Sequence, residues 1–546
     1  MSARLGERLI AKGLLNQGDL ERALDLQRER GDKLGKILID LGFVAPREVL
    51  AALSEQLETP LVSGDDFPPV LPDVKGISPA YMRQFQFLPF ASEDSTLTVA
   101  MSDPLDFETI STIRSATSLH VRPLLASEQD ILDAIDKYFG EEEEDEREVG
   151  DDTADAAEIE HLRDMASEAP VIRLVNNMIS QALERRASDI HVEPFEKDFR
   201  IRYRVDGVLH EEESPARELQ AAVISRIKLM ARLNIAERRL PQDGRIKIKV
   251  MGHEVDLRVS TLPTLYGESV VMRILDRSAG DFYDLTRLGF DGHMLERMQF
   301  YTSLPHGIFL VTGPTGSGKS TTLYSALKRI NGTDKKIITI EDPVEYQMDG
   351  INQIHVNPQI GLTFAAGLRH IVRQDPDVIM VGEIRDRETA DIAIRSSLTG
   401  HFVFSTLHTN DAPSAITRMT DMGVENYLIT SSVVAVLAQR LVRQICPQCK
   451  VEGGMKTTLD GTQVQTWRGT GCDACLGTGY IGRVGIFELM ELGEELRSLI
   501  MADADAAKLT AAARRRGMHS LREDGWKKVE AGVTTVDEVI RVTQEF

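Results

Sequence analysis

The sequence predicts a multidomain α/β protein whose C-terminal half forms a mainly parallel sheet covered by helices on both faces. Three observations predict this fold class. The chain has 546 residues, too many for one hydrophobic core, so roughly three to five domains are expected. Strand-like and helical stretches alternate beyond residue 307. A glycine-rich turn with the spacing G-x-x-x-x-G-K-S joins one of these strands to the next helix.

The charge composition indicates a protein that does not bind nucleic acid in general. The four cysteines, all in C-x-x-C pairs, suit a reducing compartment. The net charge is −22, and residues 141–160 alone hold twelve acidic side chains and one arginine. General binding to nucleic acid needs an excess of Lys and Arg. No apolar run reaches the roughly 18 residues that a membrane span needs, and the first residues lack the apolar core of a secretory signal. We therefore expect a cytoplasmic location.

Residues 1–66 are expected to form a helical repeat module. One pattern occurs twice, 29 residues apart, and each copy reads as a short helix, a glycine turn and a second helix. The matching positions are Arg4, Leu5, Gly6 and Gln27 in the first copy and Lys33, Leu34, Gly35 and Gln56 in the second.

Four further segments follow this module. Residues 67–140 alternate short apolar runs with helical stretches, which predicts a small α/β subdomain. The acidic tract within residues 141–165 has little to bury and is expected to be a disordered linker. Residues 166–280 combine amphipathic helices with strands and predict an α+β domain. The last domain, residues 281–546, has predicted strands at 308–312, 336–340, 378–381 and 402–404.

The glycine-rich turn predicts a phosphate-binding loop. Glycines allow successive backbone N–H groups to face a polyphosphate, and the helix N-terminus adds partial positive charge. Lys319 would reach the terminal phosphates, and the Ser320 hydroxyl would bind Mg²⁺. The residues expected to bind nucleotide are Gly313, Pro314, Thr315, Gly316, Ser317, Gly318, Lys319, Ser320 and Thr321.

Polar residues beside the other predicted strands are candidates for the hydrolytic machinery. Glu345 and Glu383 each follow a strand, and either carboxylate could orient or deprotonate water for phosphoanhydride hydrolysis. His401 and His408 bracket another strand and could sense the γ-phosphate. Considered singly, each glutamate is more often a solvated turn residue and each histidine a structural one.

These residues lie in segments that resemble the four sequence boxes of secretion-superfamily ATPases. The segments are 313–320, 339–345, 373–385 and 399–409, and further matches cover nearly the whole chain. The chain is most similar to type II secretion assembly ATPases, with type IV pilus extension ATPases close behind. The resemblance implies a RecA-like domain in a hexameric ring that hydrolyses ATP with Mg²⁺. It also implies Glu345 as the catalytic carboxylate, Glu383 in the Walker B position, and His401 and His408 in a histidine box.

The resemblance further implies that the PAS-like α+β domain supplies arginines to the nucleotide. Arginine presents a planar fork of donors to phosphate oxygens, so a neighbouring domain can complete a site when it closes. Arg245, Arg258 and Arg273 are the candidates by similarity. The alternative is that arginines on exposed strand faces only solvate the sheet.

Four cysteines in two C-x-x-C pairs predict a structural metal site. Such pairs supply four thiolates to a tetrahedral Zn²⁺ ion and leave no coordination position open. Reduced thiols without metal and a redox motif are the alternatives. The resemblance favours zinc, because many assembly ATPases of this family carry such an insertion. The predicted knuckle spans residues 446–475, with Cys446, Cys449, Cys472 and Cys475 as the ligands.

The N-terminal repeat resembles the tandem motif of domains that bind cyclic di-GMP. Arg4 could contact phosphate or stack on guanine, and the glycines would allow close backbone approach. The second copy departs from the motif, because Lys33 cannot form the forked contact of an arginine. The alternative is a helical docking module that contacts a membrane-protein partner, and the two functions could coexist.

The resulting hypothesis is an ATP-driven homohexameric motor that powers pseudopilus assembly and protein export by a type II secretion system. Its partners would be inner-membrane platform proteins, which would recruit it to the cytoplasmic face of that membrane. A type IV pilus extension ATPase is the alternative within the same class. A DNA translocase would need inward-facing basic residues and salt-sensitive DNA binding. A nucleotide-dependent regulatory scaffold is the third class, and no nucleic-acid partner is expected.

Overall fold

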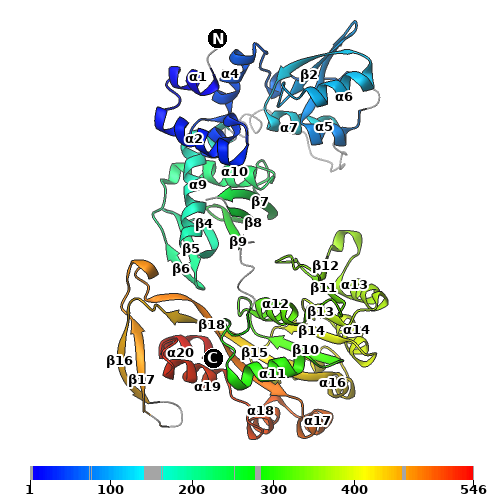
Figure 1. The fold of residues 1–546 in the computed structure, drawn as a ribbon, viewed down its shortest axis with the longest axis vertical. Coiled ribbons are helices and arrows are strands. Elements are labelled where there is room, and N and C mark those ends of the chain that lie inside the picture. Colours follow the sequence, from blue (N-terminus) through cyan, green and yellow to red (C-terminus); the bar gives the residue numbers. More distant parts are fainter. Residues whose placement is uncertain are drawn as a thin grey trace. The chain divides into compact units, whose positions relative to one another are not determined.

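The computed structural model describes residues 4–72, 74, 77–139, 162, 164–250, 253–276, 284–457, 461 and 463–544. Contacts divide the chain into two compact units. The first holds most residues up to Arg273, and the second holds the later residues together with the short segments Arg204–Leu209 and Ile248–Asp256 (Figure 1). The multidomain α/β class predicted from the sequence is confirmed. Most of the acidic tract expected to be a disordered linker, within residues 141–165, lies outside the described residues.

The N-terminal residues fold into two helix pairs, as the repeat predicts. The glycine turns inside the two pairs adopt left-handed conformations, with φ of 72° at Gly13 and 66° at Gly42. The helices are α1 (Leu5–Ala11) and α2 (Gln17–Arg30) in the first copy, and α3 (Leu34–Asp40) and α4 (Pro46–Leu57) in the second.

The two glycines of the repeated Leu-Gly pattern serve helix packing. Gly6 and Gly35 are buried, and a Cβ atom placed on them would lie 2.5 Å from Leu20 and 3.0 Å from Val49. Leu20 and Val49 occupy equivalent places on the second helix of each copy. The absent side chains therefore let the paired helices approach each other, which differs from the close ligand approach that the motif suggested.

The next segment is a small α/β subdomain. Strand β1 pairs with β2 in antiparallel register, and β2 pairs with β3 in parallel register. The helices pack against this sheet around a separate hydrophobic core. The elements are η1 (Gly64–Asp66), α5 (Pro79–Phe85), β1 (Phe87–Glu93), β2 (Thr96–Met101), α6 (Phe107–Thr117), β3 (His120–Leu125) and α7 (Glu128–Phe139).

An α+β segment follows, built on a six-stranded sheet of order β6-β5-β4-β9-β8-β7. The apolar face of α9 is buried, and Tyr203 of β5 donates a hydrogen bond to the Met178 carbonyl of α9 at 2.9 Å. The elements are α9 (Ala169–Glu184), β4 (Ala187–Pro194), β5 (Phe199–Val205), β6 (Val208–Glu211), η2 (Arg217–Leu219), α10 (Gln220–Met230), β7 (Gln242–Val250), β8 (His253–Thr264) and β9 (Gly267–Asp276).

The second unit contains a seven-stranded sheet of order β12-β11-β13-β14-β10-β15-β18. Neighbouring strands of this sheet pair in parallel, except β15 and β18, which are antiparallel. Beyond β15 the chain forms the separate hairpin β16–β17 (Figure 1). The strands are β10 (Gly307–Thr312), β11 (Ile337–Glu341), β12 (Asn352–His355), β13 (Val378–Val381), β14 (Phe402–Leu407), β15 (Val433–Ile445), β16 (Lys450–Thr457), β17 (Gln463–Gly469) and β18 (Tyr480–Glu491).

Helices cover both faces of this sheet. Successive residues of β10 alternate between two cores: Ile308 and Leu310 belong to one, and Phe309 and Val311 to the other. A strand buried on both faces is typical of a parallel α/β sheet. The helices are α11 (Gly292–Thr302), α12 (Lys319–Ile330), η4 (Pro358–Ile360), α13 (Phe364–Ile371), η5 (Val372–Gln374), α14 (Arg387–Leu398), α15 (Ala412–Asp421), α16 (Asn426–Ser432), η6 (Asp473–Cys475), α17 (Glu494–Met501), α18 (Ala506–Arg515), α19 (Leu521–Glu530) and α20 (Val536–Thr543).

Among the helices that the structure describes, none combines the length and the hydropathy of a bilayer-spanning segment.

Candidate functional site

The candidate site lies at the edge of the sheet where β10, β14 and β15 run side by side in parallel. Thr312, the last residue of β10, is in register with Leu407 of β14 and with Ala438 of β15. The chain segments that follow these three residues therefore meet at one edge. The Thr312 hydroxyl lies 2.7 Å from the Thr409 hydroxyl and accepts the Thr409 backbone N–H at 2.9 Å.

The glycine-rich loop between β10 and α12 packs directly on β15. Gly313 and Gly318 have φ of 150° and 86°, a region that favours glycine. A Cβ atom on Gly313 would lie 2.5 Å from the Gln439 carbonyl oxygen, so no side chain fits there. The Gln439 side chain accepts a buried hydrogen bond from the Thr322 hydroxyl at 2.7 Å. These contacts hold the loop and the first turn of α12 in the backbone conformation that phosphate binding requires.

Lys319 opens α12 and is buried against the loop. Its Nζ donates hydrogen bonds to the carbonyl oxygens of Gly313 at 2.7 Å and Pro314 at 3.1 Å. Burial lowers the pKa of Lys319 to about 8, because desolvation disfavours the ammonium form. An anionic ligand at this position would restore the charge, so the environment of Lys319 suits a polyphosphate.

His408 connects the lysine to the predicted Walker B glutamate. Its Nδ1 lies 3.5 Å from Lys319 Nζ, and its Nε2 lies 3.4 Å from a carboxylate oxygen of Glu383. The other Glu383 oxygen accepts a hydrogen bond from Arg385. Burial and the nearby Lys319 charge lower the pKa of His408, which favours the neutral ring. In the tautomer with hydrogen on Nε2, the His408 ring accepts a hydrogen bond from Lys319 through Nδ1 and donates one to Glu383 through Nε2.

Ser320, Thr321 and Glu345 occupy the positions that the sequence indicates around this loop. Ser320 and Thr321 are half-buried in the first turn of α12, where the Ser320 hydroxyl could ligate Mg²⁺. Glu345 is exposed in the segment after β11, and its backbone N–H donates to the Tyr324 hydroxyl at 3.3 Å. Lys319, Ser320, Glu383 and His408 thus belong to neighbouring segments of one sheet edge.

His401 lies at the opposite edge of the sheet. It precedes β14, and its carbonyl oxygen accepts the backbone N–H of Gly307, the first residue of β10, at 3.3 Å. Its ring Nδ1 lies 2.7 Å from the Ser396 carbonyl oxygen. A six-residue strand spans roughly 20 Å, so His401 is separated by that length from the loop of its own chain. Of these two histidines, His408, which follows β14, shares the edge with Lys319.

The three candidate arginines lie on adjacent strands of the six-stranded sheet. Arg245 of β7, Arg258 of β8 and Arg273 of β9 are all exposed. Arg273 Nε donates to the Asp189 carboxylate at 3.0 Å. The strand order places β9, β8 and β7 side by side, so the three arginines belong to adjacent strands of one sheet.

Two polar residues of β15 belong to this edge but were not predicted. Gln439 contacts the loop glycine, and Arg440 Nη2 donates to Asn410 Oδ1 at 2.9 Å. The Arg440 charge also helps to lower the pKa of Lys319, after the larger effect of burial. The signal for both was the Gln-Arg pair directly after the apolar run Val433–Ala438, because a polar side chain within a buried strand indicates a specific contact.

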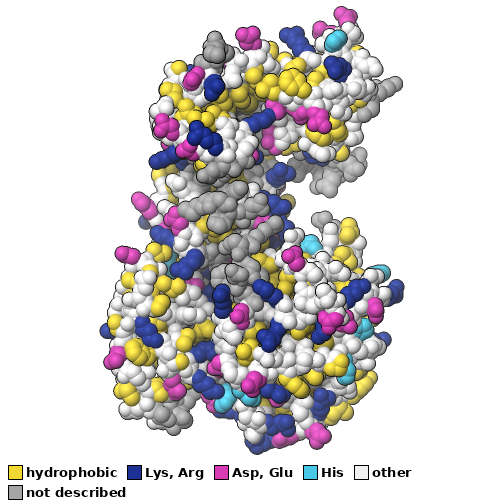
Figure 2. All heavy atoms as spheres, viewed as in Figure 1, with side chains coloured by type: hydrophobic (Ala, Val, Ile, Leu, Met, Phe, Trp, Pro, Cys, Tyr) yellow, Lys and Arg dark blue, Asp and Glu magenta, His cyan; other side chains and the backbone are white. Residues whose placement is uncertain are grey.

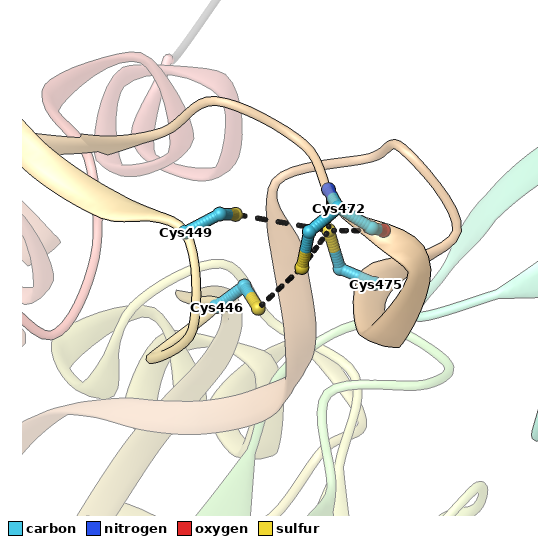
Figure 3. Close-up of side chains that lie close together, drawn as sticks. All are labelled: Cys446, Cys449, Cys472 and Cys475. Atoms are coloured by element: carbon cyan, nitrogen blue, oxygen red, sulfur yellow. Dashed lines mark hydrogen bonds between the residues drawn. The ribbon is translucent and has the colours of Figure 1, made fainter.

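The four cysteines form a second candidate site, separate from the loop (Figure 3). Their sulfur atoms lie within 4.8 Å of one another. Individual Sγ–Sγ distances are 3.7 Å for Cys446–Cys472, 3.8 Å for Cys449–Cys475 and 3.7 Å for Cys472–Cys475. A tetrahedral Zn²⁺ site with Zn–S bonds of about 2.3 Å has edges of about 3.8 Å. The geometry therefore fits four thiolates around one zinc ion.

The parallel sheet, the G-x-x-x-x-G-K-S loop and the adjoining carboxylates define a P-loop ATPase with a RecA-like fold. Residues 164–541 match the family described as Type II/IV secretion system protein, and residues 57–145 match the MshEN domain. The chain belongs to the Type II/IV secretion system protein family and is an ATP-hydrolysing secretion ATPase.

Relatives from both branches of this family resemble the whole chain. Type II secretion system protein E of Xanthomonas campestris pv. campestris is 48% identical, over 99% of this chain and 98% of the relative. Type IV pilus assembly ATPase PilB of Myxococcus xanthus is 44% identical, over 99% of each chain. The structure of the Yersinia pseudotuberculosis ATPase DotB matches with a TM-score of 0.50 at 21% identity, over 67% of this chain and 92% of DotB, and supports the fold alone.

Nucleotide binding should be accompanied by proton uptake near pH 8. Since burial lowers the pKa of Lys319 to about 8, its side chain is roughly half protonated at that pH, and a bound triphosphate favours the charged form. We expect uptake of about half a proton per site at pH 8 and close to none at about pH 6.5. Titration calorimetry with a magnesium-bound, non-hydrolysable ATP analogue, in buffers of different ionisation enthalpy, measures this.

Lys319→Arg provides the control, because arginine stays charged at both pH values. Equal proton uptake by Lys319→Arg and the wild type would show that another group takes up the proton.

Proposed function

We propose that this chain is the hexameric ATPase that powers pseudopilus assembly and protein export by a type II secretion system. The observation that carries the proposal is the similarity to a type II secretion system protein E, which extends over 99% of the chain and includes the N-terminal segments as well as the ATPase region. A type IV pilus extension ATPase is the second candidate, favoured by the similarly complete match to PilB.

The proposed roles of the site residues follow from their positions. Lys319 would bind the terminal phosphates, and Ser320 would hold the Mg²⁺, which would neutralise charge on the phosphates. Glu345 orients or deprotonates the attacking water. Glu383 is held by His408 and Arg385 at the same edge, which suits a carboxylate that acts on the metal's water shell.

Three exposed arginines on adjacent strands support the proposal of a ring. Arg245, Arg258 and Arg273 present positive charge on one sheet, and in a hexamer such a surface can complete a nucleotide site. Inner-membrane platform proteins are the proposed partners, through the N-terminal segments and the ATPase ring. The proposed location is the cytoplasmic face of the inner membrane.

A DNA translocase is not favoured by the distribution of charge. The net charge of −22 opposes binding to a polyanion. On the face shown in Figure 2, Lys and Arg side chains are interspersed with Asp and Glu side chains over the surface. The described residues on that face therefore show no continuous basic stripe of the kind that nucleic-acid binding requires.

Substitutions at Lys319 and Glu345 test the proposed chemistry. We expect Lys319→Ala to lose ATP turnover through weakened phosphate binding, by at least about 100-fold. We expect Glu345→Gln to lower kcat by roughly 100- to 1000-fold while nucleotide still binds, because the amide is a poor base. Phosphate release by purified protein measures turnover. Equal rates in the wild type and both variants would contradict an enzymatic role for this site.

Deletion of the gene in its host distinguishes the two secretion-related functions. Loss of exoprotein release with intact pili is the result expected for a type II secretion ATPase. Complementation with the wild type should restore release, and complementation with Glu345→Gln should not. Loss of pili with normal exoprotein release would contradict the proposal and support the pilus extension ATPase.

We also propose that the four cysteines hold a structural Zn²⁺ ion. Their sulfur spacing of 3.7–3.8 Å matches the edges of a zinc–thiolate tetrahedron and exceeds the roughly 2 Å of a disulfide. Backbone N–H groups of Cys472 and Gly479 donate to the Cys475 sulfur at 3.1 and 3.2 Å, which suits a thiolate. Four protein ligands leave no position for catalysis, so the role is to fix the chain beyond β15.

The N-terminal repeat is proposed to bind cyclic di-GMP. Arg4 is exposed, as a ligand contact requires, whereas Lys33 forms an ion pair with Asp103, between β2 and α6 of the small α/β subdomain. We therefore expect the first copy to contribute more binding energy than the second.

Titration calorimetry with cyclic di-GMP should give binding to the wild type and at least about tenfold weaker binding to Arg4→Ala. An absence of heat at millimolar ligand would contradict the proposal and leave protein docking as the function of the repeat.

A further inference from the structure

A buried carboxylate lies beneath the segment that carries Glu345. Glu341 is the last residue of β11, and only 4% of its surface is exposed. Its two oxygens accept hydrogen bonds from the Tyr324 hydroxyl, the Thr339 hydroxyl and, at 3.2 Å, the Gln353 amide. Burial raises the pKa of Glu341 above its usual range, although these donors oppose the rise. The hydrolytic roles proposed above do not use this residue.

Tyr324 joins this carboxylate to the helix that begins with Lys319. It is fully buried on α12, and its hydroxyl donates to Glu341 while accepting the backbone N–H of Glu345 at 3.3 Å. Burial raises the pKa of Tyr324, so the hydroxyl keeps its proton and remains a donor. A single oxygen therefore connects the phosphate-binding helix, the end of β11 and the backbone of the proposed catalytic residue.

A second bridge fixes the remainder of the same segment. Gln353 of β12 donates to Glu341 and to the Tyr346 carbonyl oxygen, the latter at 2.8 Å, and accepts the Met348 backbone N–H at 2.7 Å. The Tyr346 ring packs edge-on against the Tyr324 ring, with centroids 6.1 Å apart. The segment after β11 is thereby attached at Glu345, Tyr346 and Met348 to side chains that are bonded to Glu341.

We propose that Tyr324 and Glu341 are positioning residues for ATP hydrolysis, which place the Glu345 carboxylate relative to the phosphates held by Lys319. The inference rests on the proposed catalytic role of Glu345. Neither residue need touch nucleotide, because the effect passes through the hydrogen bond to the Glu345 backbone. A carboxylate misplaced by about 1 Å loses much of its effect on the rate while leaving substrate binding intact. A network that only stabilised the fold would not lower the rate of hydrolysis while leaving substrate binding intact.

Tyr324→Phe is the direct test. It removes the hydroxyl that joins Glu341 to the Glu345 N–H and retains the ring. We expect kcat for ATP to fall roughly 10- to 100-fold, with KM and the affinity for a magnesium-bound, non-hydrolysable analogue changed by less than about twofold. Steady-state phosphate release by the full-length protein and titration calorimetry provide these values. Glu341→Gln should likewise lower kcat without changing KM or the affinity for the analogue, and it serves as the test if Tyr324→Phe does not fold.

Tyr301→Phe is the matched control. Tyr301 is another buried tyrosine of the ATPase domain, on α11, and its hydroxyl accepts a hydrogen bond from Arg297 at 3.2 Å. Loss of the Tyr301 hydroxyl should lower the midpoint of thermal unfolding by an amount similar to that of Tyr324→Phe. It should leave kcat within about twofold of the wild-type value. Equal kcat losses in Tyr301→Phe and Tyr324→Phe would overturn the proposal in favour of a general effect of stability.

A double-mutant cycle separates this inference from the proposed role of Glu345. If Tyr324 acts through Glu345, the losses of Tyr324→Phe and Glu345→Asp should be less than additive. Strict additivity, or an unchanged kcat in Tyr324→Phe, would overturn the inference. Wild-type turnover in Glu345→Gln would instead overturn the catalytic role itself, whatever Tyr324→Phe does.

Discussion

The nucleotide site depends on the parallel pairing of β10 with β14 on one side and β15 on the other. This pairing brings the glycine-rich loop, the segment after β14 and the polar residues of β15 to one sheet edge. The close contact of Gly313 with the Gln439 carbonyl leaves no room for a side chain and sets the path of the loop. Because α12 continues from that loop, the same contact also determines where Lys319 begins the helix and where Tyr324 meets Glu341.

The charges at this edge are arranged around a buried lysine. Desolvation lowers the pKa of Lys319 to about 8, and a neutral His408 separates it from Glu383. Glu383 is in turn paired with Arg385, so its carboxylate has a defined orientation. A polyphosphate with Mg²⁺ supplies the negative charge that stabilises the ammonium, which links the stability of the loop to its ligand.

Local sequence patterns predicted the parts of the structure that depend on short separations. The strand, turn and helix around Lys319, the helical repeat and the C-x-x-C pairs each draw on neighbouring residues, and each was found where expected. The order of strands in the sheet depends on distant pairing and could not be derived from the pattern. For the same reason Gln439 and Arg440, which join the loop from β15, were missed. His401 and His408 were expected to bracket one strand, and they do lie at opposite ends of β14. The sequence analysis did not single out Tyr324, and only the fold shows that its hydroxyl meets Glu341.

The most direct measurement for this account is an experimental structure of the protein with Mg²⁺ and a non-hydrolysable ATP analogue. The account predicts that Lys319 Nζ exchanges the carbonyl oxygens of Gly313 and Pro314 for phosphate oxygens, with Ser320 on the metal. It also predicts the Glu345 carboxylate within hydrogen-bonding distance of a water in line with the γ-phosphate. A nucleotide bound elsewhere, or a Glu345 carboxylate directed away from that water while Tyr324 remains bonded to Glu341, would contradict it.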